Sequence, residues 1–131
     1  MCHFIVQGDD MKNNARSTWE IYTLSWSESD ASERLKLFEQ SLSPDCVYID
    51  PLIQTNGYEQ LSGYMIELHK MVPRVQFITT AFSSHHDRSL AQWNMLDANG
   101  NVLSQGASYG LYGIDGRLIQ MTGFYAIPDA I

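Results

Sequence analysis

Asp50 is the residue of this chain best placed to act as a base. It closes the short apolar segment Cys46–Ile49 and precedes Pro51. A carboxylate at the end of an apolar strand lies where the chain leaves the core, and partial burial there makes it a usable base. The other interpretation is a turn carboxylate, because Asp-Pro commonly begins a turn.

A tyrosine on an amphipathic helix offers the complementary group. Trp19, Tyr22 and Trp26 recur at i, i+3 and i+7, which places them on one helical face. A buried tyrosine needs a partner for its hydroxyl. Tyr22 is therefore either a packed core residue or a hydrogen-bond donor directed into a pocket, where it would stabilise a developing oxyanion.

The segment His85-His86-Asp87 either begins the second long strand or ends the loop before it. Adjacent histidines on a strand point to opposite faces, so the pair is not expected to chelate one metal ion. One of the two, His85 or His86, is expected to face the pocket as an acid, a base or a donor, and His85 is included among the expected catalytic residues. The alternative is a pair exposed in a loop. The sequence has no zinc motif, nucleophile elbow or dinucleotide fingerprint, so neither metal nor cofactor is expected.

Size and charge limit the possible classes. The chain has 131 residues, 44% of them hydrophobic, which suits one globular domain. A net charge of −7 argues against nucleic acid as a partner, and no apolar run approaches the roughly 20 residues that span a membrane. Two cysteines without disulfide or metal spacing favour a reducing cytoplasm. Gly8-Asp9-Asp10 breaks the periodicity, so residues 1–12 are expected to be a flexible tail before a single domain, 13–131.

Three helices and an antiparallel meander are expected to position these groups. The helices run from about Asn14 to Ser27, from the cap Asp30 to Pro44, and from Asn56-Gly57 to Pro73. Hairpin signals at Asn99-Gly100 and Asp115-Gly116 separate the later strands. The strands are expected at Cys46–Ile49, Val75–Phe82, Ser89–Leu96, Val102–Tyr112 and Arg117–Ala126. This order predicts an α+β fold, a cone-shaped barrel with three helices on a curved, mostly antiparallel sheet.

The open end of such a cone is expected to hold a small apolar ligand. Alternation along the strands and helices predicts an inward-facing set made of Trp19, Tyr64, Trp93, Tyr109, Met121 and Tyr125. The other sheet face needs cover, which predicts a homodimer. The residues expected on that second face are Leu90, Leu103, Tyr112 and Ile119.

From about Asn14 to Ala126 the chain resembles the SnoaL-like group of the nuclear transport factor 2-like superfamily. That group includes polyketide cyclases, ketosteroid isomerases and limonene epoxide hydrolases. In the first half the resemblance is carried by the first-helix stripe with Ser29-Asp30, by Asp45-Cys46-Val47-Tyr48-Ile49-Asp50-Pro51, and by Gly57. In the second half it is carried by His85-His86-Asp87 with Trp93, and by Asp115-Gly116-Arg117-Leu118 through Thr122-Gly123-Phe124-Tyr125.

Similarity to ketosteroid isomerase implies roles for individual residues. Asp50 falls on the general-base aspartate and Tyr22 on the oxyanion-hole tyrosine, while Tyr64 and Tyr125 fall on aromatic pocket residues. The isomerase has a protonated aspartate as its second oxyanion donor, and Gln105 lies in the corresponding region here. The Gln105 amide can donate a hydrogen bond but is not an acid. The resemblance therefore implies proton abstraction with oxyanion stabilisation, and it does not extend to steroid isomerisation itself.

The sequence therefore predicts a cofactor-independent isomerase or cyclase. Asp50 would abstract a proton α to a carbonyl of a small apolar polyketide, steroid or terpenoid-like compound. Tyr22, with Gln105 or His85, would stabilise the enolate, and proton return or aldol-type ring closure would follow. The alternatives are a non-catalytic module for ligand binding or dimeric assembly, and an epoxide hydrolase in which Asp50 activates water.

Overall fold

In the computed structural model the backbone is described for residues 2–127 and the side chains for residues 14–127. Within this part the chain forms three helices and six strands. The helices are α1 (Cys2–Ser25), α2 (Ala31–Ser41) and α3 (Gly57–Met71). The strands are β1 (Leu42–Asp50), β2 (Ile53–Asn56), β3 (Gln76–His85), β4 (Arg88–Leu96), β5 (Val102–Tyr112) and β6 (Leu118–Phe124). The predicted α+β class is confirmed.

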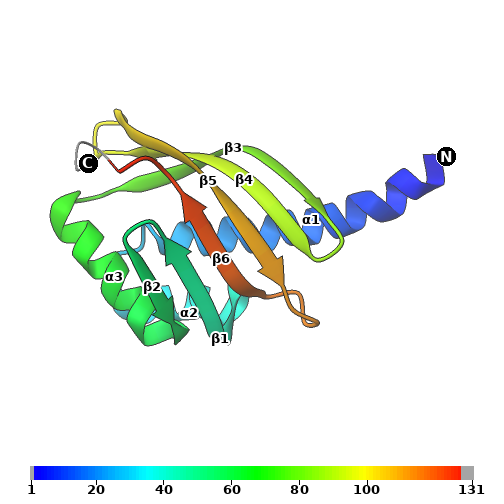
Figure 1. Cartoon of the computed structure of the whole chain (residues 1–131), viewed down its shortest axis with the longest axis horizontal. Coiled ribbons are helices and arrows are strands. Elements are labelled where there is room, and N and C mark those ends of the chain that lie inside the picture. The colour runs from blue at the N-terminus through cyan, green and yellow to red at the C-terminus, as the bar shows by residue number, and fades with distance from the viewer. Residues whose placement is uncertain (1, 128–131) are drawn as a thin grey trace.

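The six strands form one curved sheet in the order β2-β1-β6-β5-β4-β3. All neighbouring pairs are antiparallel except β1 and β6. Register shifts interrupt four of the five strand pairs, and such bulges bend a sheet. The helices lie against the face that this bending makes concave (Figure 1). The predicted cone of three helices on a mostly antiparallel sheet is therefore confirmed.

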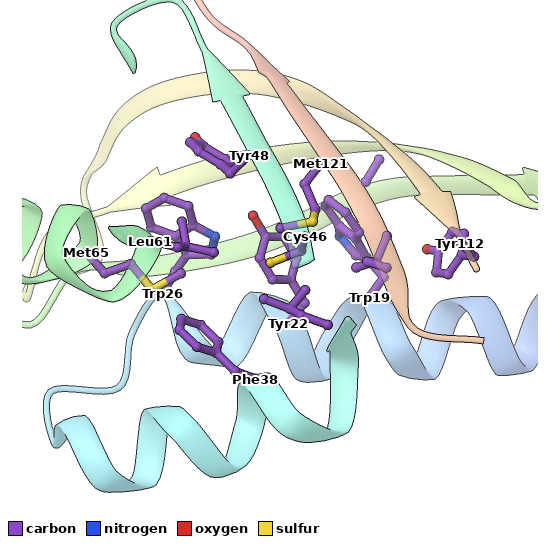
Figure 2. Packing of buried hydrophobic residues seen from close by; sticks show 13 residues of the cluster. Trp19, Tyr22, Trp26, Phe38, Cys46, Tyr48, Leu61, Met65, Tyr112 and Met121 are labelled. Atoms are coloured by element: carbon purple, nitrogen blue, oxygen red, sulfur yellow. The ribbon is translucent and has the colours of Figure 1, made fainter. Parts of the chain in front are cut away.

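The apolar stripe of α1 provides the centre of the core. Trp19, Tyr22 and Trp26 are all buried, as their helical spacing predicts. Figure 2 shows them directed from α1 toward the sheet, where Tyr48 and Met121 meet them. Each buried aromatic side chain contributes about 2–3 kcal/mol by removing apolar surface from water, so this stripe holds α1 in place.

Several boundaries differ from the sequence-based expectation. The second helix ends at Ser41 and not at Pro44, because β1 begins at Leu42 and includes Pro44, four residues before the expected start at Cys46. The helix α1 begins at Cys2 and not near Asn14, and its N-terminal half extends past the sheet (Figure 1). A single glycine costs a helix only about 1 kcal/mol, so Gly8 does not end it. In addition, residues expected in a loop after Pro51 form β2, a four-residue strand that pairs with β1. Such a short hairpin strand depends on its partner for stability.

Candidate active site

The Asp50 carboxylate is buried at the end of β1 and accepts four hydrogen bonds. Its Oδ1 atom accepts from the backbone N–H groups of Leu52 and Ile53, at 2.8 and 3.1 Å. Its Oδ2 atom accepts from the hydroxyls of Tyr48 and Tyr64, at 2.7 and 2.9 Å. An ionised carboxylate offers about four acceptor positions, so all of them are used. Oδ1 closes the turn between β1 and β2, and Oδ2 faces the tyrosines.

Two elements bring the tyrosines to Asp50. Tyr48 precedes Asp50 by two residues on β1, so the period of a strand puts both side chains on the same face. Tyr64 comes from α3, which packs against β1. Trp26 supports both rings, with centroid distances of 5.3 Å to Tyr48 and 6.1 Å to Tyr64. The geometry around Oδ2 therefore depends on α1, β1 and α3 together.

The tyrosines beside Asp50 remain protonated hydrogen-bond donors. Burial is the largest cause that raises the pKa values of Tyr48 and Tyr64, and the negative charge of Asp50 raises them further. The same two causes raise the pKa of Tyr125, whose hydroxyl lies next to Tyr64. At neutral pH this cluster therefore presents O–H donors around one carboxylate.

The sheet forms the wall opposite α3. The Trp93 indole N–H donates to the Ser108 hydroxyl at 3.0 Å, and the Trp93 ring lies 6.1 Å from that of Tyr125. Gly123 faces Asp50. A β-carbon at Gly123 would lie 3.6 Å from the Asp50 β-carbon and 3.5 Å from the Tyr48 hydroxyl, both ordinary contacts. The glycine thus leaves room for about one methyl group beside the carboxylate.

Tyr22 is buried behind this cluster and not hydrogen-bonded to Asp50. The centroid of its ring lies 5.1 Å from that of Trp19 and 6.4 Å from that of Trp26. Burial raises its pKa, and Asp50 is the last of the contributing causes. Among the described residues, the donors on the Asp50 side chain are Tyr48 and Tyr64. Tyr48 was not among the predicted site residues, although its spacing from Asp50 on one strand was a usable signal.

The structure groups some of the predicted residues and separates others. Tyr64 donates to Asp50, Tyr125 lies beside Tyr64, and Trp93 lies beside Tyr125, while Trp19 and Met121 lie deeper in the same core. Three predicted residues lie elsewhere. Gln105 pairs with Asn94, and Tyr109 pairs with Leu90 and Thr122, so both belong to the outer sheet face. Their assignment to the inner face was wrong, because the strand alternates inward at Gly106, Ser108 and Gly110 instead.

His85 is also remote from Asp50. It ends β3 at one edge of the sheet, and β4, β5 and β6 lie between β3 and β1. The His85 side chain is exposed beside His86, and the two Nδ1 atoms are 3.0 Å apart. The prediction that adjacent histidines point apart was wrong, because His86 adopts a left-handed conformation with φ of 52°. The turn therefore ends the alternation of the strand at that residue.

The described part of the molecule contains two hollows whose lining does not include Asp50. One is an apolar groove between α2 and α3, lined by residues such as Leu35, Phe38 and Ile66. The other, of about 680 Å³, lies between α1 and the two hairpin turns that contain His85 and Gly116. The expected apolar pocket around Asp50 is neither of these. Aromatic rings fill the space next to Asp50 in this structure.

Other binding features can be delimited within the described residues. No group of three His, Cys, Asp or Glu side chains there is arranged to hold a metal ion. None of the described helices is long and apolar enough to cross a membrane. Cys46 is buried, and burial raises the pKa of its thiol to about 11, so the thiol is neutral at physiological pH.

Comparison with known proteins identifies the fold. No protein-family profile matches the sequence, and no curated protein matches it. A SnoaL-like family protein from Agrobacterium tumefaciens superimposes with a TM-score of 0.80 and 20% identity, covering 88% of this chain and 99% of that chain. A SnoaL-like protein from Jannaschia gives a TM-score of 0.71 and 16% identity, covering 88% of this chain and 87% of the other.

A third neighbour carries the superfamily name directly. An NTF2-like protein of unknown function from Exiguobacterium gives a TM-score of 0.66 at 13% identity, over 83% of this chain and 98% of its own. Identities this low establish a shared fold and leave the reaction open. The predicted resemblance is confirmed at that level: the chain has the NTF2-like fold of the SnoaL-like proteins.

Proposed function

We propose that this protein is a cofactor-independent isomerase or cyclase that abstracts a proton α to the carbonyl of a small apolar compound. The observation that carries the proposal is the buried Asp50 carboxylate with two tyrosine hydroxyls on its Oδ2 atom. The names of structural neighbours agree with it. The Agrobacterium protein is provisionally named as an isomerase and the Jannaschia protein as a polyketide cyclase.

The two carboxylate oxygens of Asp50 have different roles, one structural and one as proton acceptor. The backbone bonds from Leu52 and Ile53 hold Oδ1 and fix the plane of the carboxylate. Oδ2 takes the proton from the carbon next to the carbonyl, and a tyrosine hydroxyl stabilises the enolate oxygen. A positioned base contributes about 10²–10⁴-fold and a positioned donor about 10²–10³-fold. These few groups suffice for a substrate whose α-proton is already acidic.

Hydrogen–deuterium exchange tests this reaction without knowledge of the native substrate. A panel of β-diketones and β,γ-unsaturated ketones is incubated in D₂O, and loss of the α-proton signal is followed by NMR. The wild-type protein is expected to accelerate exchange or isomerisation of at least one compound. The Asp50→Asn variant keeps the shape and removes the charge, so it is expected to lose the acceleration. Equal rates for both proteins would refute Asp50 as the base.

A ligand-binding module is the second candidate, and a specific observation favours it. All four acceptor positions of Asp50 are already used inside the protein, as in a purely structural carboxylate. In that case a compound from the panel would bind the wild-type protein and Asp50→Asn equally, with no exchange. Epoxide hydrolysis has less support, because no arginine and no second carboxylate contacts Asp50 among the described residues.

We also propose that the outer face of the sheet pairs with a second copy of the chain. Strands β3 to β6 contain a single Lys, Arg, Asp or Glu, which is Arg88. Leu90, Leu103 and Ile119 are exposed as expected for this face. Tyr112 is not, because it is 8% exposed and hydrogen-bonds Ser89 in the interior, so its assignment to the outer face was wrong.

Sedimentation velocity at micromolar concentration tests the dimer. The wild-type chain is expected to sediment as a dimer, and Leu90→Lys with Leu103→Lys is expected to sediment as a folded monomer, because each lysine would bury a charge at the contact. A wild-type monomer would contradict the proposal.

A further inference from the structure

We propose that Tyr64 is a catalytic residue that exchanges hydrogen-bond partners during the reaction. In the free protein it donates to Asp50 Oδ2, and with substrate bound it donates to the substrate carbonyl oxygen. This role rests on the proposed proton abstraction by Asp50. It explains how a carboxylate that already accepts four hydrogen bonds can still accept a proton.

One of the four donors must leave before Asp50 can act as a base. A proton arriving from a C–H bond needs a free lone pair, and the carboxylate has none. The two backbone donors of Leu52 and Ile53 belong to the turn between β1 and β2. Their loss would break the ladder that pairs Asp50 with Ile53. The donor that leaves is therefore one of the two tyrosines on Oδ2.

Tyr48 is held too firmly to be that donor. It is 7% exposed, and β1 pairs at this residue with Thr55 on one side and Met121 on the other. Its ring also packs against Trp26. Any rotation of Tyr48 would thus disturb a core that is already filled, and moving close-packed side chains off their rotamers is costly.

Tyr64 has the freedom that Tyr48 lacks. It is only half-buried, it comes from α3 and not from the sheet, and its bond to Oδ2 is the longer of the two. Tyr125 is also half-buried, and its hydroxyl lies next to that of Tyr64. Asp50 is only 8% exposed, and neither of the two hollows described above includes it, so a covering side chain must move for a substrate to arrive. Of the side chains that cover Asp50, Tyr64 is therefore the one that can rotate away.

The exchange couples two requirements of the chemistry. When Tyr64 turns to the carbonyl oxygen, it frees one lone pair of Oδ2, which can then accept the proton. The α C–H bond then breaks, its proton passes to Oδ2, and its electron pair forms the enolate. Tyr64 donates to the enolate oxygen and keeps its own proton, because burial raises its pKa. Asp50 later returns the proton, or the enolate attacks a second carbonyl.

Tyrosine labelling detects the exchange directly. With ¹³C at the ζ position, the Tyr48 and Tyr64 signals are assigned from Tyr48→Phe and Tyr64→Phe, and 2-naphthol is added because its oxygen on an apolar ring resembles an enolate. The Tyr64 signal is expected to shift on binding while the Tyr48 signal stays. A shift of Tyr48 alone, or binding with neither signal moving, overturns the role of Tyr64. Failure of 2-naphthol and of the ketone panel to bind removes the proposed function itself.

Kinetics on a compound that exchanges provide a second readout. Tyr64→Phe is expected to lower kcat by about 10²–10³-fold with little change in KM, because the lost donor acts mainly on the enolate. Tyr58→Phe is the matched control on the same helix, because the Tyr58 hydroxyl donates to the Leu42 carbonyl and not to Asp50, and it is expected to stay within about fivefold of the wild type. Thermal unfolding verifies that both variants are folded. A Tyr64→Phe variant with the wild-type kcat refutes the exchange.

Discussion

Two ends of this molecule carry acid–base side chains, and their surroundings differ completely. At the end beside α3, Asp50 is 8% exposed and every acceptor position of its carboxylate is occupied. At the end beside α1, His85 and His86 lie exposed on the β3–β4 turn and contact mainly each other. Figure 1 shows the β1–β2 turn and the β3–β4 turn toward opposite ends of the molecule. The residue types make both regions candidates for acid–base chemistry. Only burial and hydrogen-bond partners distinguish Asp50 from the histidine pair.

The comparison shows how a curved sheet separates residues that look equivalent in the sequence. Asp50 closes a strand that α3 covers, so its side chain is enclosed by tyrosines. His85 closes the edge strand β3 at a turn, and its side chain is exposed. A strand end becomes a chemical site only where another element shields it from water.

The largest expected contrast is in activity. On a compound that the protein turns over, Asp50→Asn is expected to reduce the rate by at least about 10³-fold, whereas His85→Gln with His86→Gln stays within about twofold. Exchange rates of the purified variants, measured side by side, provide the comparison. A larger loss in the histidine variant than in Asp50→Asn would move the site to the α1 end.

The second contrast is in packing, at two glycines of β5. A β-carbon at Gly106 would lie 2.4 Å from the Trp93 ring and 2.6 Å from the Phe124 carbonyl, whereas at Gly110 the nearest atoms are ends of the Leu118 and Ser89 side chains. Backbone cannot move aside as a side chain can. Gly106→Ala is expected to cost about 3 kcal/mol and Gly110→Ala about 1 kcal/mol of unfolding free energy. Urea denaturation measures both, and equal costs would contradict a tighter Asp50 end.

The third contrast concerns high pH. Burial raises the pKa of Tyr112, near the α1 end, from 10.0 to about 12. The unfolded phenol therefore ionises first, so stability is complete below about pH 10 and falls by about 2–3 kcal/mol as the pH approaches 12.

Denaturation curves of wild type and Tyr112→Phe isolate this effect, because the other tyrosines titrate in both proteins. The stability difference between them is expected to shrink as the pH rises from 10 to 12. A constant difference would show that Tyr112 ionises normally in the folded protein.

The smallest expected effect is at His86. Its φ of 52° is unfavourable for any residue with a β-carbon. His86→Gly removes that strain and adds chain entropy to the unfolded state, so a net gain of about 0.5 kcal/mol is expected. A loss above about 1 kcal/mol in denaturation would show that the His85–His86 contact contributes more than the backbone strain.

The sequence predicted this fold well because its strongest signals are local. The aromatic stripe of α1, the proline that follows α3 and the Asn-Gly and Asp-Gly turns act within a few residues. β2 was missed because four residues carry almost no periodicity. The long start of α1 was missed because a glycine next to two aspartates reads as a break, although a helix tolerates it.

For the site, the sequence by itself determined that Asp50 ends an apolar strand and that Tyr48 shares its face. It also determined that Trp19, Tyr22 and Trp26 share a helical face, because these relations follow from the periods of strand and helix. Only the tertiary structure decided that Tyr64 and not Tyr22 donates to Asp50, that β5 turns Gln105 and Tyr109 outward, and that His85 lies across the sheet. Those outcomes depend on bulges and on how α3 docks, and both arise from contacts between residues far apart in the chain.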